Sequence, residues 1–306
     1  MKRKVILYEL NEVSWDVIDY YVSLKPKSNL ASILGYSQCL TTVNQDYQAL
    51  QPWITWPTFH KSMYSNEHNI FRLGQEPKSF LGEDLWVIAE QNGLSVGLFG
   101  ALQSWPAHEP AHGGFYVPDT FSKTAVTFPS WAENFQRFNL MMTQKNSSYT
   151  CPDLEFYQLA KAGISLLKTG LTLNSMRKII IHILQEQLDK RYKARRSIIQ
   201  VLPSFDLYWK LQQEYKPDLS IFFTNHVASM MHRFWGDTFS NYCKSYPQYK
   251  PDPVARNFVK TAMDFFDYQL GIIMNFMAMF IITAKSLKFR NTILRDRWQI
   301  DSDRVT

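Results

Sequence analysis

KVILYELNE, residues 4–12, is an apolar and β-branched run that passes directly into polar residues. A strand that is buried on both faces of a parallel sheet has this near-continuous apolar pattern. We therefore predict a central parallel strand over residues 4–10. The apolar run stops at Glu9, which is too early for the core of a secretory signal, so we expect the basic residues 1–4 to lead into this strand in a cytoplasmic protein.

Two further stretches repeat the alternation of helix and strand. Residues 85–92 have a helical pattern that ends at Gly93, a common C-cap residue, and residues 95–100 follow as a strand. Residues 219–223 form another buried apolar run, and residues 226–234 have the pattern of the next helix. Helices and strands in this order build a doubly wound sheet. The predicted fold class is α/β, with a doubly wound, mostly parallel sheet, flanking helices and a helical insertion.

The helical insertion, or cap, is predicted over residues 151–216, where apolar residues recur at helical spacing. It separates the N-terminal part of the α/β core, residues 1–150, from its continuation, residues 217–284, and residues 285–306 form an atypical tail. Shorter elements are expected as helices at 14–21, at 26–34 and from near Thr55, a strand at 38–43, a surface loop at 104–118, and a long helix between 251 and 275.

The chain has 306 residues, a formal net charge of +6 and a pI near 9.0. This charge favours an anionic substrate, a nucleic acid or an acidic membrane surface as partner. The densest basic run, residues 190–196, follows an apolar helical stretch and is interpreted as a solvated helix end, so nucleic acid is not an expected partner. The apolar stretch 270–284 is shorter than the roughly 20 residues that span a bilayer. It predicts a buried helix, or a helix that runs into a strand, and no transmembrane segment.

Polar side chains follow the predicted strands at the edge where ligands bind in open α/β sheets. Carboxylates, amides and imidazoles that converge from separate strand ends can hold a divalent metal. Taken singly, each cluster is explained by local capping; taken together, they favour a site. No CxxC pair exists, so a cysteine zinc site is not indicated. The candidate residues are Glu9, Asn11, Thr55, Thr58, His60, His68, Asn225, His226 and His232.

Thr55 precedes Pro57 at the predicted start of a helix. Backbone N–H groups are free at such a position, so a hydroxyl there could attack phosphorus while the helix N-terminus stabilises the anion. An ordinary N-cap role fits Thr55 equally well, and Thr58, one turn further on, is the substitute nucleophile. Asp119 is a candidate substrate contact, and a turn-forming role fits it equally.

Four segments resemble type I phosphodiesterase and nucleotide-pyrophosphatase-like members of the alkaline-phosphatase superfamily. In that family they correspond to the first strand, the nucleophile segment, the approach to the substrate loop, and a strand and helix that carry an acid and a histidine. They occur here in the family's order. The segments are VILYELNEVSWDVI at 5–18, PWITWPTFHKSMYSNEHNIF at 52–71, VGLFGALQSWP with GGFYVPDTF between 96 and 121, and DLSIFFTNHVASMMHRFW at 218–235.

The resemblance implies two metal ions, usually zinc, on either side of a threonine or serine that is transiently phosphorylated. Thr55 takes the nucleophile position, and Asn11 stands at the first acid with Glu9 and Glu12 nearby. Asn11 is neutral where the family has an acid, which weakens cation binding. The remaining metal ligands are expected at His232, Asn225 and His226. The substrate, an anionic small-molecule, glycan or nucleotide ester, is expected to contact His60, His68 and Asp119.

The family also needs a later Asp-His-Gly-like motif and a distal histidine. After Asp267 the chain has no histidine, which suggests a truncated or altered C-terminus. The expected function is metal-dependent hydrolysis, or transfer, of phosphodiester, pyrophosphate or sulfate esters through a threonine nucleophile, impaired by loss of these ligands. One alternative is a catalytically inactive fragment that binds a ligand or a protein. Another is a membrane-surface protein that uses the basic helical segment and residues 270–284.

Overall fold

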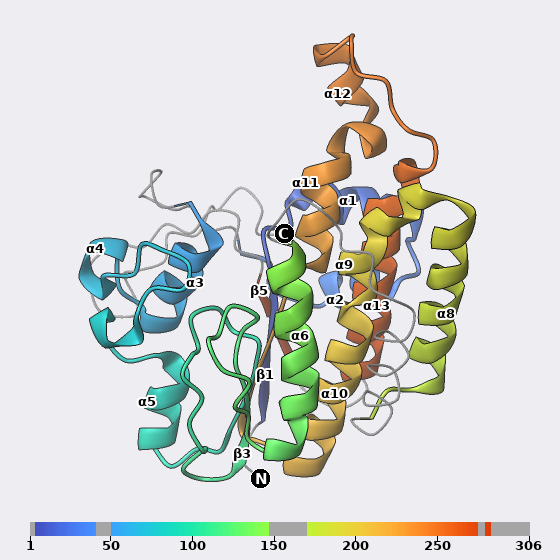
Figure 1. Ribbon diagram of the computed structural model, residues 1–306. Helices are drawn as coiled ribbons and strands as arrows, with labels where there is room; N and C mark the ends of the chain where they lie inside the picture. The colour runs from blue at the N-terminus through green and yellow to red at the C-terminus, as the bar shows by residue number, and fades with distance from the viewer. Residues whose placement is uncertain (1–3, 41–49, 147–169, 275–278, 283–306) are drawn as a thin grey trace.

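The structure, a computed structural model, describes residues 4–40, 50–146, 170–274 and 279–282 (Figure 1). Its described strands form one parallel sheet in the order β3-β2-β4-β1-β5. This confirms the predicted α/β fold class. The strands are β1 (Val5–Leu10), β2 (Val96–Phe99), β3 (Gly114–Val117), β4 (Leu219–Thr224) and β5 (Met279–Ile282).

β1 lies between β4 and β5, as its apolar sequence predicts. Val5 pairs with Leu219 and Leu10 with Thr224, so β1 and β4 end at the same edge of the sheet. Every residue of β1 after Val5 is buried. Alternate side chains of a strand point to opposite faces, so a strand with a helical layer on each side needs an apolar residue at nearly every position.

Helices cover both faces of the sheet (Figure 1). One layer packs on Leu7, Leu98 and Ile221. The opposite layer packs on Tyr8 and Phe222 and contains most of the hydrophobic core. The first layer is α3 (Pro52–Lys61), α4 (Ser65–His68) and α5 (Leu85–Gln91); the second is α1 (Trp15–Leu24), α2 (Asn29–Leu34), α6 (Glu133–Asn146), α9 (Arg196–Ile199), α10 (Val201–Tyr215), α11 (His226–Thr238) and α13 (Phe258–Met274).

Other elements lie outside these two layers. α8 (Leu173–Leu188) packs on α9 and α10 at the outer side of the second layer, and α12 (Ser240–Ser245) extends from the end of α11 (Figure 1). Short 3₁₀ turns complete the described chain at Pro77–Ser79, Ser130–Ala132, Lys190–Arg195 and Ala255–Asn257.

An aromatic cluster around Phe222 fixes the second layer to the sheet. The ring centroid of Phe222 lies 4.6 Å from that of Tyr208 in α10, 5.3 Å from that of Tyr8 and 5.5 Å from that of Phe99. Full burial of a side chain of this size contributes about 1.5–3 kcal/mol, and a well-oriented ring pair adds about 0.5–1.5 kcal/mol. The strand ends therefore rest on a rigid core.

Gly97 of β2 lies beneath the ring of Phe115 of β3. A Cβ atom at Gly97 would lie 2.5 Å from this ring and 2.9 Å from the ring of Pro217. Carbon atoms pack favourably at about 3.5–4.0 Å, so either contact would be a severe overlap. Position 97 therefore lacks a side chain because the Phe115 ring occupies the space.

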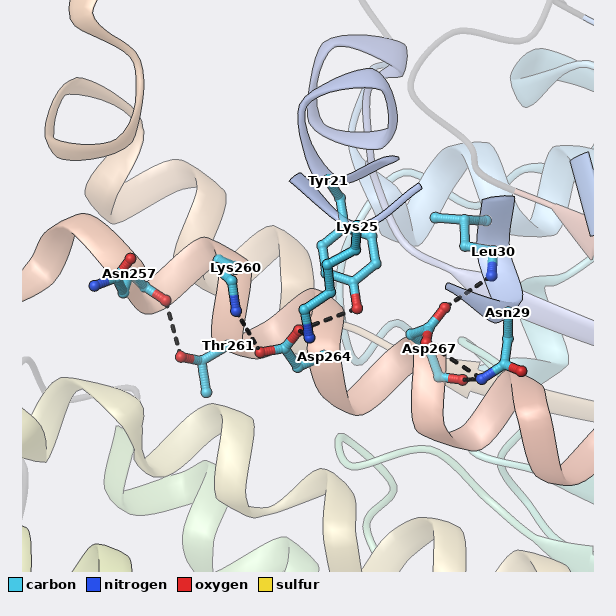
Figure 2. Close-up of polar contacts among 9 residues, drawn as sticks. All are labelled: Tyr21, Lys25, Asn29, Leu30, Asn257, Lys260, Thr261, Asp264 and Asp267. Carbon is cyan, nitrogen blue, oxygen red and sulfur yellow. Dashed lines mark hydrogen bonds and ion pairs between the residues drawn. The ribbon is translucent and has the colours of Figure 1, made fainter. Parts of the chain in front are cut away.

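Asp264 of α13 holds α1 against the second layer (Figure 2). Its carboxylate accepts hydrogen bonds from Tyr21 at 3.0 Å, Lys25 at 2.6 Å and Lys260 at 2.9 Å. Burial alone would raise the pKa of Asp264, but the two lysines outweigh burial and lower the pKa. Asp264 is therefore an anion balanced by neighbouring cations.

Asp267, one turn further along α13, holds α2 in the same way (Figure 2). Its carboxylate accepts from the backbone N–H of Leu30 at 2.7 Å and from the side-chain amide of Asn29 at 3.2 Å. A carboxylate at the first turn of a helix satisfies a free N–H group and complements the helix dipole. We refer to the residues around the two carboxylates as the α13 network: Tyr21, Lys25, Asn29, Leu30, Lys260, Asp264 and Asp267.

Several predicted boundaries differ from the structure. The helix expected from near Thr55 begins at Pro52, because proline at the first helical position starts the helix earlier. Residues 38–40 are not in a strand, and the rest of the strand predicted at 38–43 lies outside the described residues. The loop predicted at 104–118 contains β3, which pairs with β2.

The segment predicted as a helical insertion is helical over the described residues 170–216. Residues 151–169 and the predicted tail, 285–306, lie outside the description. α10 packs directly on β2, β3 and β4, so this part of the segment belongs to the core layers and does not form a separate cap. The stretch 270–284 runs from α13 into β5, as one of its two predicted forms requires. Within the described residues, no helix has the length and apolar character needed to cross a membrane.

Candidate functional site at the carboxyl edge of the sheet

The carboxyl ends of β1 and β4 lie next to each other in the middle of the sheet. The chain leaves β1 and crosses over β4 to reach β2, whereas it leaves β4 and crosses over β1 to reach β5. Connections that depart in opposite directions open a crevice above neighbouring strand ends, and ligands bind in such crevices. The polar residues that follow β1 and β4 should therefore converge at this crevice.

A chain of hydrogen bonds joins three of the predicted segments at this crevice. The indole N–H of Trp56 in α3 donates to Oδ1 of Asn11 at 2.7 Å, and Nδ2 of Asn11 donates to Oδ1 of Asn225 at 2.7 Å. Asn11 follows β1 and Asn225 follows β4. Asn11 and Trp56 are buried, whereas Asn225 is exposed. Asn11 therefore uses its amide as both acceptor and donor to tie α3 and the two strand ends together.

Glu12 and His232 form a second contact at this edge. Nε2 of His232 lies 2.7 Å from Oε2 of Glu12, and the His232 side chain is 59% exposed. Glu12 has φ of +53°, in the left-handed region that a side chain with a Cβ atom disfavours. Strained backbone of this kind is concentrated at binding and active sites. The surrounding structure therefore holds the Glu12 backbone in a conformation that this residue disfavours, as is typical of a binding or active site.

Glu9 and His60 lie on the side of β1 that α3 covers, and neither residue lines the crevice. Oε1 of Glu9 and Nε2 of His60 are 2.6 Å apart, and neither side chain is exposed. The His60 ring also stacks on Trp56 with 5.9 Å between ring centroids. The second carboxylate oxygen of Glu9 and Nδ1 of His60 have no hydrogen-bond partner in the described structure. This buried pair anchors α3 to β1 and is inaccessible to a substrate.

Thr55 does not occupy the N-cap position predicted for it. The N-cap residue is Gln51, and the backbone N–H of Thr55 already donates to the carbonyl of Gln51 at 2.9 Å. The Thr55 hydroxyl donates to the same carbonyl at 3.3 Å. Free backbone donors, which motivated the nucleophile role, are therefore absent at Thr55. Pro52 and Trp53, one turn earlier, line the crevice in its place.

Thr58 and His68 form a buried pair whose proton positions follow from its contacts. The backbone N–H of Ile70 donates to Nδ1 of His68 at 3.0 Å, so the neutral ring carries its proton on Nε2. Nε2 lies 3.0 Å from Oγ1 of Thr58, which itself donates to the carbonyl of Ile54 at 2.9 Å. Burial, with a further contribution from Lys61, lowers the pKa of His68 to about 4. His68 therefore donates to Thr58 and cannot take its proton in this arrangement.

His226 has a structural contact at each ring nitrogen. Nε2 lies 3.2 Å from the carbonyl oxygen of Ala262 in α13, so this nitrogen carries the proton and donates. Nδ1 then accepts from the hydroxyl of Thr224 at 2.7 Å. Burial lowers the pKa of His226 to about 3, although its bond to Ala262 acts in the opposite direction. His226 therefore fastens α11 to β4 and α13.

Asp119 ties loops together near the end of β3. Its carboxylate accepts from the backbone N–H groups of Gln103 at 2.6 Å and Phe121 at 2.7 Å. Burial raises the pKa of Asp119 to about 6, against the lowering effect of these hydrogen bonds. The side chain is buried. Of the two roles open from the sequence, these contacts favour the turn-forming one.

A cavity of about 760 Å³ lies above the strand ends. Asn11, Asn225 and Thr224 are among the residues at its base. α3 and α9 lie on opposite sides of the sheet, so the cavity has two different walls (Figure 1). What we call the apolar wall consists of Pro52, Trp53, Leu73, Leu102 and Phe121; the basic wall consists of Asn139, Lys193, Arg196, Ser197, Gln200, Ser229 and Arg233.

Arginines define the charge of the basic wall. Arg196 is held by Glu186, to which its Nε and Nη2 donate at 2.9 and 2.7 Å. Burial would raise the pKa of Glu186, but hydrogen bonds from His182 and Arg196 lower it to about 2. Arg233 is exposed and has no hydrogen bond or ion pair with the described residues. Glu12 is the one carboxylate among the described lining residues, so cations predominate.

The basic wall was not predicted. The basic run 190–196 has the composition of a solvated helix end, but the structure places Lys193 and Arg196 in the lining of the cavity. Arg233 lies next to His232, a predicted metal ligand, but a single arginine in a helix does not by itself indicate a binding site. Arg233 lies two turns after the start of the helix predicted at 226–234, so its place in that helix is the signal that could have identified it.

Most of the predicted metal ligands already use their side-chain nitrogen and oxygen atoms in contacts within the protein. Asn11 is committed to Trp56 and Asn225, His226 to Thr224 and Ala262, and Glu9 to His60. Among the described residues, no three histidine, cysteine or acidic side chains form a group that could hold a metal ion. Zinc sites need three or four such ligands. The donor set does not fit the two-zinc centre implied by the resemblance, and zinc binding stays a prediction that metal titration can test.

A scan against protein-family models and a search of curated proteins each find no match to the chain. The resemblance to the alkaline-phosphatase superfamily therefore stays a prediction. What the structure contributes is the α/β fold and the contacts at the carboxyl edge of its sheet, and function is inferred from these.

Proposed function

We propose that the chain binds a small anionic ester, with a phosphate or sulfate group on the basic wall of the cavity. The observation that carries this proposal is the excess of cations over carboxylates at the carboxyl edge of a parallel sheet. A cleft lined by one sign of charge concentrates ligands of the opposite sign. Guanidinium groups match the oxygen geometry of phosphate and sulfate, so Arg233 is the principal contact, and Arg196, which Glu186 holds in place, adds to the positive charge of the wall.

The apolar wall specifies the rest of the ligand. Trp53 and Phe121 lie among the apolar residues that face the cavity, and Phe121 is 40% exposed. Aromatic side chains at a binding cleft pack against rings and sugars. A ligand with an anionic group at one end and a ring at the other would contact both walls.

The test is isothermal titration calorimetry of the full chain with p-nitrophenyl phosphate and p-nitrophenyl sulfate. We expect binding that weakens as salt is added, because partly exposed charges are screened. Arg233→Gln should weaken binding by about tenfold through the loss of one charge-assisted hydrogen bond. p-Nitrophenyl glucoside has the ring without the charge and should bind more weakly than either ester.

A matched variant controls for net charge. Arg256→Gln removes an exposed arginine that lies outside the cavity lining, so it should leave ester binding unchanged. Equal losses in Arg233→Gln and Arg256→Gln would assign the effect to overall charge. No binding of either ester to the wild type would contradict the proposal.

Ester hydrolysis or transfer is the second candidate function. The observation that favours it is the exposed His232, which lies 2.7 Å from Glu12, while Asn11 contacts both Glu12 and Asn225. These residues come from the segments that resemble the first strand and the later metal-binding strand and helix of the alkaline-phosphatase superfamily. Their convergence supports an ester substrate, even though the described residues do not contain the donor set for two zinc ions.

Turnover of bis-p-nitrophenyl phosphate, measured with and without added zinc, separates hydrolysis from binding. If Thr55 is the nucleophile, Thr55→Ala abolishes turnover, and if His232 is a zinc ligand, His232→Ala lowers the zinc bound. Turnover that is unchanged in Thr55→Ala would remove Thr55 from this role. Binding of esters without turnover would support the binding function alone.

A further inference from the structure

α8 carries a stripe of apolar side chains that the described structure leaves exposed. Helical residues spaced by three, four or seven positions share one face, and the stripe follows this spacing. The opposite face of α8 contains the buried residues Ser175, His182 and Glu186, and it packs on α9 and α10. The exposed fractions are 82% for Leu173, 54% for Ile180, 42% for Ile181, 57% for Leu184 and 88% for Leu188.

Such a stripe is unusual for a helix that faces only water. Single exposed apolar residues are ordinary, whereas a contiguous group of large ones marks an interaction surface. α8 lies at the outer edge of the molecule, away from the sheet (Figure 1). The stripe lies on the face of α8 opposite to Glu186, which holds Arg196 of the basic wall, so the cavity does not account for it and it needs its own explanation.

The charges around the stripe are cationic. Arg177 lies on the same face, one turn after Leu173, and Lys190 is exposed just beyond the helix end. Glu186 is the one carboxylate in α8, and it is buried against Arg196. Asp189, the next residue after the helix, is paired with Arg191 at 2.6 Å. The exposed face of α8 thus combines apolar side chains with cations and has no acidic side chain of its own.

We propose that α8 docks the protein on an anionic lipid surface. A helix with an apolar face and flanking cations lies in the plane of the interface, where the apolar side chains enter the acyl boundary and the cations meet lipid phosphates. The long side chain of Arg177 can extend to the headgroups while its stem stays with the leucines. The proposal is independent of the ligand in the cavity.

A second copy of the chain fits this face less well. Two copies packed through α8 would bury Arg177 with no carboxylate of the opposite helix to pair with it, since Glu186 is committed to Arg196. A buried charge without a partner is costly, whereas an anionic membrane supplies a partner for every cation. The absence of exposed acids on α8 therefore favours lipid over self-association.

Vesicle flotation tests the proposal on the full chain. Vesicles of phosphatidylcholine alone are compared with vesicles that contain about one third phosphatidylglycerol, an anionic lipid. The wild type is expected to float with the anionic vesicles and to remain mostly unbound with the neutral ones. Leu184→Ser with Leu188→Ser should lower the partition coefficient by about tenfold or more, and Arg177→Gln by about fivefold.

The control is a pair of substitutions of the same type elsewhere. Leu24 and Leu81 are 48% and 55% exposed and lie outside α8, so Leu24→Ser with Leu81→Ser should leave flotation unchanged. All variants change exposed residues, and circular dichroism verifies that they fold. Equal flotation of the α8 double variant and the wild type would overturn the proposal.

Two other outcomes would also overturn it. One is equal binding to neutral and anionic vesicles that Arg177→Gln does not alter. The other is a wild type that stays unbound with both vesicles and forms a dimer, seen by light scattering, that the α8 double variant loses. That result would assign the stripe to self-association.

Discussion

The α13 network and the basic wall of the cavity both contain cationic side chains but use them differently. In the α13 network, Lys25 and Lys260 both reach Asp264, so charge is balanced inside the fold (Figure 2). At the basic wall, Arg233 has no partner among the described residues and faces a cavity. Charge that is balanced within a protein contributes to its stability, whereas charge that faces a cavity is available to a ligand. Whether a cationic side chain has an acidic partner therefore separates the structural role from the ligand-binding role more clearly than whether it is a lysine or an arginine.

The largest expected effect tests whether the α13 network is structural. Asp264→Ala removes an acceptor shared by Tyr21 and two lysines, and the Tyr21 side chain is buried. Loss of hydrogen bonds to a charged group that is partly buried should lower the free energy of unfolding by about 2 kcal/mol. Urea denaturation measures this change. Lys260→Ala, which removes one partly exposed ion-pair partner, should cost no more than about 0.5 kcal/mol.

The next effect concerns His226, which joins the helix that carries Arg233 to α13. Its pKa in the fold is about 3, below the usual histidine value of 6.5, so the unfolded chain binds the proton more tightly. Stability from neutral His226 is complete above pH 6.5 and is lost as pH falls toward 3. Linkage gives a loss of about 2 kcal/mol between pH 7 and pH 5. Urea denaturation at these two pH values measures the loss.

A variant isolates the contribution of His226. Asp119 acts in the opposite direction, because its raised pKa of about 6 makes the protonated form favourable in the fold as pH falls. His226→Gln keeps a neutral side chain that can donate, so its stability should depend less on pH over the same range. An identical pH dependence in wild type and His226→Gln would show that His226 is not responsible.

Asn11→Ala has an intermediate effect at the base of the cavity. The substitution leaves the buried indole N–H of Trp56 without its acceptor at 2.7 Å. An unsatisfied buried donor costs about 1–3 kcal/mol. Urea denaturation should show this loss, and Asn11→Asp, which keeps an acceptor for Trp56, should lose less. Equal losses would mean that the bond to Asn225 matters more than the bond to Trp56.

The smallest expected effect is the stability change in Arg233→Gln. An exposed arginine without a described partner should change the free energy of unfolding by less than about 0.5 kcal/mol. The same variant is expected to weaken ester binding by about tenfold. If Arg233→Gln instead destabilised the fold as much as Asp264→Ala does, the division between the two regions would fail.

Elements with a strong local pattern could be predicted from the sequence. β1, β2 and β4 are apolar runs, and Gly93, which adopts φ of +75°, ends the helical turn before β2. β3 could not be predicted because it starts at Gly114, directly after Gly113, in a stretch that has the composition of a loop. Only pairing with β2 makes it a strand, and pairing between distant segments is not encoded locally.

The candidate site was predicted in part for the same reason. The meeting of Asn11 with Asn225 follows from the rule that parallel strands end at one edge of a sheet. The commitment of His226 to Ala262 could not be predicted, because its partner lies 36 positions further along the chain. The histidines were chosen for chemistry that needs free ring nitrogens, and tertiary contacts occupy those nitrogens at His226 and His68.

The overlap between position 97 and the Phe115 ring has a consequence for divergence of the sequence. A side chain can be added at Gly97 only if the residue at 115 becomes smaller, since a Cβ atom would otherwise lie 2.5 Å from that ring. Neither change alone is tolerated well, whereas the two together, with a small shift of the Pro217 ring, preserve the volume between β2 and β3. In an alignment of related sequences, these two positions should therefore covary, with glycine at one accompanying an aromatic residue at the other.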